Sequence, residues 1–250
     1  MAPVKTKHRS LALAIFAASV LAAASAEADS PSPAGIARNL AHGFASGDYL
    51  RALGASALRI AAGFTLAALL GGALGILQAA FTPVRRLCGP LTTGVQALPA
   101  VCWLPVALLW FGRGESAVLF CVVVGSLFAV ALGVRDGLAQ VPPLLRRVGQ
   151  TFGLSRWSQI TRITIPAALP AILAGLKQGW SFGWRALMAG ELIYATAGLG
   201  RSLTAGREAG DANQVFAVML LILFLGVAVD RLGFGLIEKR VLAKRGLASA

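Results

Sequence analysis

Residues 146–170 read RRVGQTFGLSRWSQITRITIPAALP, a basic stretch that lies between two long apolar segments. At its start, Leu145, Val148 and Phe152 recur at helical spacing. Because residues three and four apart lie on one face of a helix, residues 143–152 are predicted to form a helix that places one apolar stripe against the protein.

A break follows this helix. Gly153 is predicted to end it in a left-handed conformation, and Ser155 to cap a second helix that runs to about Ile163. The step Ile165-Pro166 is expected to be extended, because a proline disfavours the helical region in the residue before it. A helical hairpin of this kind on a membrane face is typical of a surface that docks a partner.

The spacing of Gly153 and of Ile163-Thr164-Ile165-Pro166, ten to thirteen residues later, resembles the cytoplasmic signature loop of ABC importer permeases. That family's pattern is Glu-Ala-Ala, three residues, glycine, nine residues, then Ile-x-Leu-Pro. The flanking sequence AALPAILAGLKQGW resembles the nitrate, sulfonate and taurine branch of the family. The resemblance implies that this segment, which we name the docking loop, contacts a separate ATPase subunit.

One departure from the family pattern concerns charge. The Glu-Ala-Ala positions read Arg147-Val148-Gly149, so a base replaces the acidic residue that the family turns toward the ATPase. The residues expected at the ATPase interface are Arg147, Val148, Gly149, Gln150, Phe152, Gly153, Leu154, Ser155, Arg156, Trp157, Ile163 and Pro166. Phe152, Leu154 and Trp157 are the expected apolar anchors, since interfaces favour aromatic side chains.

Composition alone indicates a membrane protein. Of 250 residues, 57% are hydrophobic and only 13% are charged, whereas charged residues make up about a quarter of soluble domains. The formal net charge is +13. Such a charge suits either a nucleic-acid binder or a membrane protein with basic cytoplasmic segments, and the apolar composition favours the second interpretation, without nucleic acid as a partner.

Six apolar segments predict an all-α, polytopic membrane protein of about six transmembrane helices. They span residues 11–26, 60–80, 87–111, 116–134, 167–192 and 212–229. The resemblance implies the fold of type I importer permeases. We divide the chain into four parts. They are an N-terminal helix (1–26), a periplasmic loop with an interfacial helix (27–58), a core permease domain (59–240) and a cytoplasmic tail (241–250).

The first apolar segment has two interpretations. Its basic start, its short length and the ending Ala24-Ser25-Ala26 also describe a cleavable signal peptide. The resembling family begins with a transmembrane helix here, which favours an uncleaved span.

Two of the spans carry packing signals. Gly71 and Gly75 form a small-xxx-small face that would let another helix approach closely. Pro90, Pro99 and Pro105 are expected to break the span at 87–111, and such breaks are tolerated inside a bundle rather than against lipid.

The distribution of basic residues predicts the orientation. With the N-terminus inside, six bases lie outside, namely Arg38, Arg51, Arg59, Arg113, Arg201 and Arg207. Fourteen lie inside, namely Lys5, Lys7, Arg9, Arg85, Arg86, Arg135, Arg146, Arg147, Arg156, Arg162, Lys239, Arg240, Lys244 and Arg245. This asymmetry places the docking loop and both termini in the cytoplasm. The resemblance implies that the membrane is the bacterial inner membrane.

Charged residues within the fifth span are candidates for a translocation path. Lys177 and Arg185 would lend positive potential to an anion, with Glu191 paired or near the outer mouth. Alternatively, Lys177 reaches the cytoplasmic interface and Arg185 merely pairs with Glu191. The other candidates are the part-polar break of the third span and one aromatic residue, namely Gln96, Pro99, Trp103 and Trp184.

Several chemistries find no support in the sequence. No Gly-x-x-x-x-Gly-Lys-Ser/Thr motif occurs, so any ATP that drives this protein is bound by another chain, and the chain is not expected to be an enzyme. His8 and His42 lie outside the spans, which argues against an intramembrane hydrolase and a metal site. The three cysteines have no paired spacing, and no cofactor is expected.

The resemblance implies a homodimeric permease, surrounded by membrane lipid, that works with ABC ATPase subunits and a periplasmic substrate-binding protein. The expected cargo is a small anion of the nitrate, sulfonate or taurine type, with bicarbonate or an uncharged pyrimidine precursor as alternatives. A secondary transporter or channel, or a membrane scaffold, is the competing hypothesis. The docking loop distinguishes them, because a secondary carrier has no reason to keep it.

Overall fold

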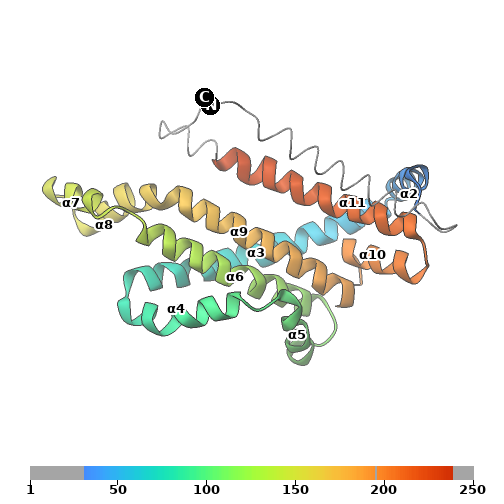
Figure 1. The fold of residues 1–250 in the computed structure, drawn as a ribbon, viewed down its shortest axis with the longest axis horizontal. Coiled ribbons are helices and arrows are strands. Elements are labelled where there is room, and N and C mark those ends of the chain that lie inside the picture. The colour runs from blue at the N-terminus through green and yellow to red at the C-terminus, as the bar shows by residue number, and fades with distance from the viewer. Residues whose placement is uncertain (1–30, 195, 239–250) are drawn as a thin grey trace.

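The computed structural model describes residues 31–194 and 196–238, apart from the side chains of Arg146 and Arg156. The predicted N-terminal helix 1–26 and the tail 241–250 lie outside these residues. Within them the chain is all-α and forms an elongated bundle (Figure 1).

Ten α-helices, one 3-10 turn and two π-helical turns make up the described chain. The α-helices are α2 Pro33–Ala45, α3 Asp48–Ala80, α4 Thr82–Gln96, α5 Leu104–Phe111, α6 Glu115–Ala139, α7 Pro143–Thr151, α8 Arg156–Gln159, α9 Ile165–Tyr194, α10 Leu199–Glu208 and α11 Ala212–Ala228. The 3-10 turn η1 is Ala100–Trp103, and the π-helical turns are η2 Ile160–Thr164 and η3 Val229–Phe234.

Four continuous helices are long and apolar enough to cross a membrane, at Asp48–Ala80, Glu115–Ala139, Trp157–Tyr194 and Ala212–Glu238. The pair Thr82–Gln96 and Ala100–Phe111 passes the same test together but is bent by 105°, as in a broken span or a re-entrant loop. These four helices and the bent pair lie at the five predicted spans within the described residues, and they confirm the predicted polytopic all-α fold.

The prediction for the third span was right about a break but inexact about its extent. The helix begins at Thr82 rather than residue 87, so Arg85 and Arg86 belong to α4. Pro90 lies inside α4 without ending it, and the chain leaves the helix around Pro99, which precedes η1. Pro105 starts α5, where its missing N–H costs nothing because the first turn of a helix has no partner for it.

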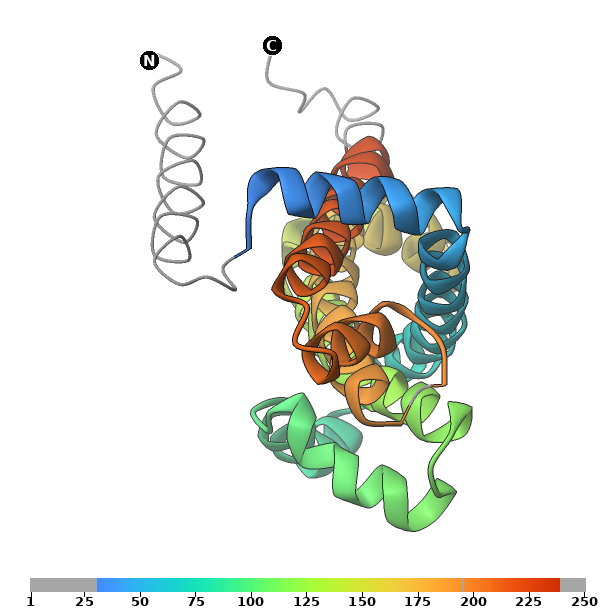
Figure 2. The same ribbon diagram turned by 90° about the vertical axis from the view of Figure 1, so that its right-hand side faces the viewer.

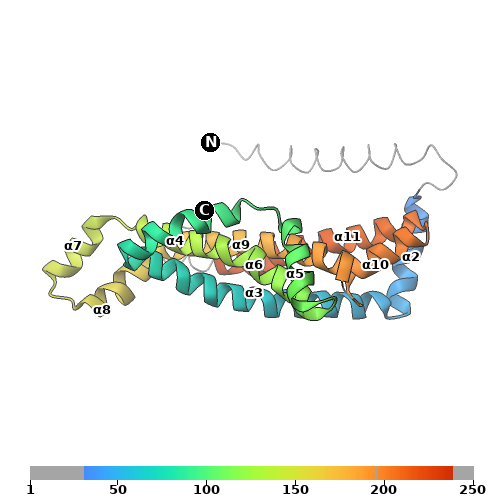
Figure 3. The ribbon, with the colours of Figure 1, turned by 90° about the horizontal axis from the view of Figure 1, so that it is seen from below.

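Helix α3 begins twelve residues before the predicted span at Ile60, because the polar first turns from Asp48 continue directly into the apolar part. The predicted interfacial helix is α2, which starts at Pro33 after the capping side chain of Ser32. Gly47, at φ 77°, makes the turn between α2 and α3. Helix α2 lies across one end of the bundle (Figure 2). We name this end, which also carries α10, the far end, and the opposite end, with α7 and α8, the loop end (Figures 1 and 3).

Close helix packing builds the centre of the bundle. The predicted small-residue face is confirmed, since Gly71 and Gly75 of α3 pack against the backbone of α6, and a Cβ on Gly75 would lie 2.6 Å from the carbonyl oxygen of Ala131. On its other side α6 meets α9, where Gly133 and Gly175 touch backbone to backbone. With no Cβ in the way, these helices approach closely enough for backbone van der Waals contact.

Candidate functional site

The turn of the docking loop is built as its residues predict. Gly153 has φ 67°, its N–H donates to the Gln150 carbonyl at 2.9 Å, and the Leu154 N–H donates to the Gly149 carbonyl at 3.0 Å. These two bonds form the Schellman motif that ends α7. Ser155 then caps α8, because its Oγ accepts from the Ser158 N–H at 3.3 Å.

The apolar stripe of α7 does not pack against the protein, contrary to the prediction. Val148 is 43% exposed and Phe152 is 78% exposed, as is 73% of Trp157 in α8. The reason is that α7 and α8 project from the loop end of the bundle, so that the outer face of the hairpin is not covered by the long helices (Figure 3).

The two arms of the docking loop brace each other. Gly149 of α7 is buried, and a Cβ there would lie 2.7 Å from Ile163 Cδ1 of η2. The Gln159 side-chain amide donates to the Leu154 carbonyl at 3.2 Å, which ties the second arm to the turn. Arg147, beside Gly149, is exposed. The loop therefore has an internal seam and a free outer face.

The expected extended step at Ile165-Pro166 is absent. Ile165 is helical, with φ −61° and ψ −50°, and its N–H donates to the Ile160 carbonyl five residues back. Pro166 has no N–H to donate, and in an α-helix its ring would collide with the carbonyl four residues earlier. The wider turn of η2 accommodates the ring. As a result α8, η2 and α9 form one helix from the docking loop into the membrane span.

A groove with a mainly apolar lining runs along the bundle between α4, α6 and α9, with a volume of about 740 Å³. Its polar lining comes from Thr93 and Gln96 of α4, Asp136 and Gln140 of the α6 end, and Gln178 of α9. The carboxylate of Asp136 is paired with Arg135, with Nε and Oδ1 2.8 Å apart. Amides and a hydroxyl therefore provide most of the hydrogen-bonding groups of the groove.

A small recess of about 20 Å³ adjoins the groove at the bend of the third span. Gln96 and Phe182 line both spaces, and Trp103 lines the recess. Pro99 lies at the break itself and precedes η1. Trp103 meets Phe120 edge to face, with ring centroids 6.3 Å apart. The structure thus brings the predicted path residues Gln96 and Trp103 together.

The remaining predicted path residues on α9 have partners within the chain. Lys177 pairs with Asp230 of η3, with Nζ and Oδ1 3.0 Å apart. The guanidinium carbon of Arg185 lies 5.1 Å from the centre of the Phe182 ring, so Arg185 is not the partner of Glu191 that one interpretation of the sequence expected. Trp184 packs against both hydrophobic clusters of the core.

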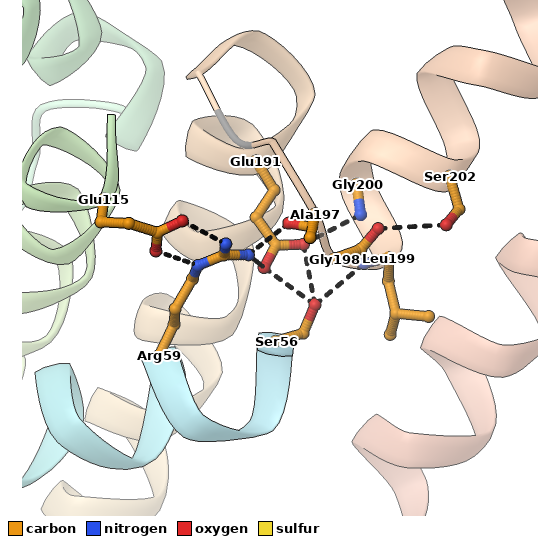
Figure 4. A network of polar contacts seen from close by, with 9 residues as sticks. All are labelled: Ser56, Arg59, Glu115, Glu191, Ala197, Gly198, Leu199, Gly200 and Ser202. Carbon is orange, nitrogen blue, oxygen red and sulfur yellow. Dashed lines mark hydrogen bonds and ion pairs between the residues drawn. The ribbon is translucent and has the colours of Figure 1, made fainter. Parts of the chain in front are cut away.

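Glu191 belongs to a buried network at the far end of the bundle (Figure 4). Its carboxylate accepts from Arg59 Nη1 at 2.8 Å and from the Gly200 N–H at 2.9 Å, and Ser56 Oγ lies 2.8 Å from both of its oxygens. Arg59 also reaches Glu115 with Nε and Nη2, each 2.5 Å from a carboxylate oxygen. Glu191 is only 1% exposed.

The network ties helices α3, α6 and α9 to the segment that leads into α10. Ser56 Oγ accepts from the Leu199 N–H at 2.9 Å. Gly198 has φ 122°, and a Cβ there would lie 2.6 Å from the Glu191 carboxylate, so a residue with a side chain does not fit. A buried carboxylate with a guanidinium, a hydroxyl and a backbone amide as partners is fully satisfied and rigid.

Sequence reasoning missed Ser56, Arg59 and Glu115. Arg59 was counted among the outer bases, because it precedes the uncharged run that begins at Ile60. A signal was present, since an ionisable residue inside a span needs a partner, and Arg59 and Glu191 are of opposite sign. Ser56 and Arg59 also lie three residues apart, on one face of a helix.

The chain matches the family model described as "binding-protein-dependent transport system inner membrane component" over residues 69–242. A putative ABC transporter permease, MJ0413 of Methanocaldococcus jannaschii, is 31% identical over 69% of this chain and 65% of its own length. The taurine transport permease TauC of Escherichia coli is 30% identical over 80% of this chain and 72% of its own. The nitrate import permease NrtB of Synechocystis is 28% identical over 71% of this chain and 64% of its own length. The chain thus spans about two thirds of the archaeal and nitrate relatives.

Two solved structures share the fold. An inward-facing form of the MetNI methionine ABC transporter superposes with a TM-score of 0.66 at 17% identity, covering 77% of this chain and 95% of its own. An amino acid ABC transporter superposes with a TM-score of 0.67 at 16% identity, covering 80% of this chain and 97% of its own. Because the family model covers more than half of the sequence, and the fold agrees with it, the chain belongs to the family of binding-protein-dependent transport system inner membrane components.

Proposed function

We propose that this chain is the permease subunit of an ABC importer that moves a small anion across the inner membrane, driven by ATP hydrolysis on a separate subunit. The observation that carries the proposal is the docking loop, whose second arm continues without interruption into the span α9. A projecting, apolar and basic hairpin on a membrane bundle suits a protein partner on the cytoplasmic side.

The docking loop works as a lever in this proposal. Its internal seam at Gly149 and Ile163 keeps the two arms at a constant angle. The outer face, with Phe152 and Trp157, seats in the ATPase, while Pro166 lies in the helix that carries the movement into the membrane. The proposed interface comprises Arg147, Val148, Gly149, Gln150, Phe152, Gly153, Leu154, Ser155, Arg156, Trp157, Ile163 and Pro166.

The remaining partners follow from the two ends of the molecule. We assign the loop end and both termini to the cytoplasm, on the excess of arginine and lysine there. The far end, with α2 and α10, then faces a substrate-binding protein. A second copy of the chain would cover the groove between α4, α6 and α9, because exposed amides such as Gln178 are costly to leave against lipid.

The translocation path is proposed along this groove and past the bend at Pro99. Gln96, Trp103 and Arg185 are its candidates among the residues singled out in the sequence. Lys177, Trp184 and Glu191 are proposed to support the path by holding α9 to its neighbours, since they contact other helices of the same chain.

The cargo is proposed from the relatives and the polar lining. The relatives include permeases named for taurine, nitrate and bicarbonate, all of which present oxygen atoms that accept hydrogen bonds. Amide groups of Gln96 and Gln178 can donate to such oxygens. A secondary carrier or channel is the alternative, and it would use the same groove without an ATPase.

The test is affinity purification of the tagged chain from its native host in mild detergent. An ATPase with a phosphate-binding loop, recovered in about equal amount, is the expected result. A variant with Phe152 and Trp157 both changed to serine should lose this ATPase while keeping its helical content. A matched control, Leu109→Ser, removes an exposed apolar side chain far from the loop and should retain it. Recovery of the wild-type chain alone would support the secondary carrier.

A further inference from the structure

The groove and the recess described above meet at two residues. The groove, of about 740 Å³, and the recess, of about 20 Å³, are both lined by Gln96 of α4 and Phe182 of α9. The groove lies on the loop-end side of these residues, along Gln140 and Ala171, and the recess lies on the side of Trp103. Gln96 and Phe182 therefore lie between the larger space and the smaller one.

Phe182 belongs to a stripe on α9 that also carries Gln178 and Arg185. Ala174, Gln178, Phe182 and Arg185 are spaced by four, four and three residues, so they lie along one face of the helix. Gln178 and Arg185 are exposed and Phe182 is half-buried. An arginine inside a membrane span is costly against lipid, which places this face toward water or protein rather than toward hydrocarbon.

Arg185 places a positive charge beside the Phe182 ring. The guanidinium of Arg185 lies 5.1 Å from the centre of the Phe182 ring, within the range of a cation–π contact. No described carboxylate forms an ion pair with Arg185, whereas the nearest acid of the groove lining, Asp136, is paired with Arg135. An aromatic ring with a cation beside it thus lies between the groove and the recess.

We propose that Phe182 is the gate of the translocation path and that Arg185, stacked on it, makes the open gate selective for anions. This inference rests on the proposed transport function. In the state described, the ring separates the loop-end groove from the recess. A tilt of α9 moves the ring aside, and the exposed guanidinium of Arg185 then donates to the passing oxyanion together with the amides of Gln96 and Gln178.

The first experiment measures leakage through the complete complex. The chain is purified with its ATPase, reconstituted into liposomes that hold an iodide-quenched dye, and exposed to iodide without ATP. Phe182→Ala should admit iodide several-fold faster than the wild type, while Phe182→Trp should remain tight. The matched control is Phe64→Ala, which removes a ring that packs on Trp180 and does not line the groove. Equal iodide entry in Phe182→Ala and Phe64→Ala would overturn the gate.

Selectivity is tested in the leaking background, with thallium entry as the cation counterpart. Phe182→Ala should admit iodide in preference to thallium. Adding Arg185→Gln should abolish that preference, and adding Arg185→Lys should preserve it because the charge remains. A preference unchanged by Arg185→Gln would overturn the assignment of Arg185.

A labelling measurement covers the case in which Phe182→Ala does not fold. In a background with Cys88, Cys102 and Cys121 changed to alanine, Gln178→Cys probes the groove and Leu98→Cys probes the recess. A membrane-impermeant thiol reagent, added on the loop side without ATP, should modify Gln178→Cys much faster than Leu98→Cys. Equal rates would overturn the gate. The transport function itself fails by a different result, namely a wild-type chain that recovers no ATPase.

Discussion

Arg59 of α3 and Glu191 of α9 form a buried ion pair across 132 residues of sequence, with Nη1 and Oε1 2.8 Å apart and side chains that are 7% and 0% exposed. This pair joins the first described span to the helix that carries the docking loop at its other end. A movement of α9 is therefore anchored at the far end of the bundle. The pair thus fixes α9 against α3 at the end opposite the docking loop.

Breaking this pair from one side should destabilise the protein strongly. Arg59→Gln leaves the Glu191 carboxylate buried without its cation, and such a loss costs about 3–5 kcal/mol. The expected result is a clearly lowered melting temperature in detergent, together with a reduced yield of folded protein.

Two controls separate charge burial from general disruption. Glu115→Gln affects an acid whose side chain is 57% exposed, so it should lower stability much less. The double variant Arg59→Met, Glu191→Leu removes both charges and should be more stable than Arg59→Gln. If Glu115→Gln and Arg59→Gln were equally damaging, the burial of Glu191 would not be the cause.

Local signals in the sequence predicted the docking-loop turn, whereas the ion pair of Arg59 and Glu191 was not predicted. The left-handed Gly153 and the capping Ser155 depend only on neighbours within a few residues, so sequence alone identified both. The partners Arg59 and Glu191 are brought together by the packing of whole helices. No local pattern states which base in a chain with 23 of them faces a given acid.

Two wrong predictions in the docking loop have physical causes. The rule for residues before proline placed Ile165 in an extended conformation. The wider π-helical turn η2 instead accommodates the ring of Pro166 within a continuous helix. The apolar stripe that includes Val148 was predicted to face the protein, but Val148 is exposed. Helical periodicity shows that apolar residues share a face and does not show which molecule covers that face. The extent of the groove was likewise hidden, because its lining comes from three separate helices.

The left-handed turn at Gly153 offers a second test. Gly153→Val forces a β-branched residue into that conformation, where L-residues are disfavoured by about 1–2 kcal/mol. The turn should change conformation, and the ATPase subunit should bind the docking loop more weakly. The measurements are the amount of ATPase recovered with the chain and the rate of ATP hydrolysis, both of which should fall. Gly153→Asn should keep most of both, since asparagine tolerates the left-handed region. Equal loss in the two variants would argue against a conformational cause.

The seam between the loop arms is tested at Gly149. A side chain there meets Ile163 Cδ1, and overpacking of this kind costs about 1–3 kcal/mol. Gly149→Val should therefore spread the arms and reduce ATP hydrolysis by the assembled complex. Adding Ile163→Ala vacates the space and should restore part of the activity, a coupling that a double-mutant cycle quantifies. If the losses of ATP hydrolysis in the two single variants were additive in the double variant, the contact between Gly149 and Ile163 would not affect ATP hydrolysis.

Lys177 and Arg185 of α9 provide a matched pair for the path itself. Arg185→Gln removes a charged donor, and a hydrogen bond to a charged group contributes about 1.5–3 kcal/mol, so ATP-driven anion uptake should fall about tenfold or more. Lys177→Gln removes the same charge from a partly exposed pair with Asp230, which contributes at most about 1 kcal/mol, so uptake should change little. The measurement is uptake of labelled taurine and nitrate by the reconstituted complex. Both variants should retain the ATPase, because neither residue lies on the docking loop. Equal uptake in the two variants would place Arg185 outside the path and leave it a packing role on Phe182.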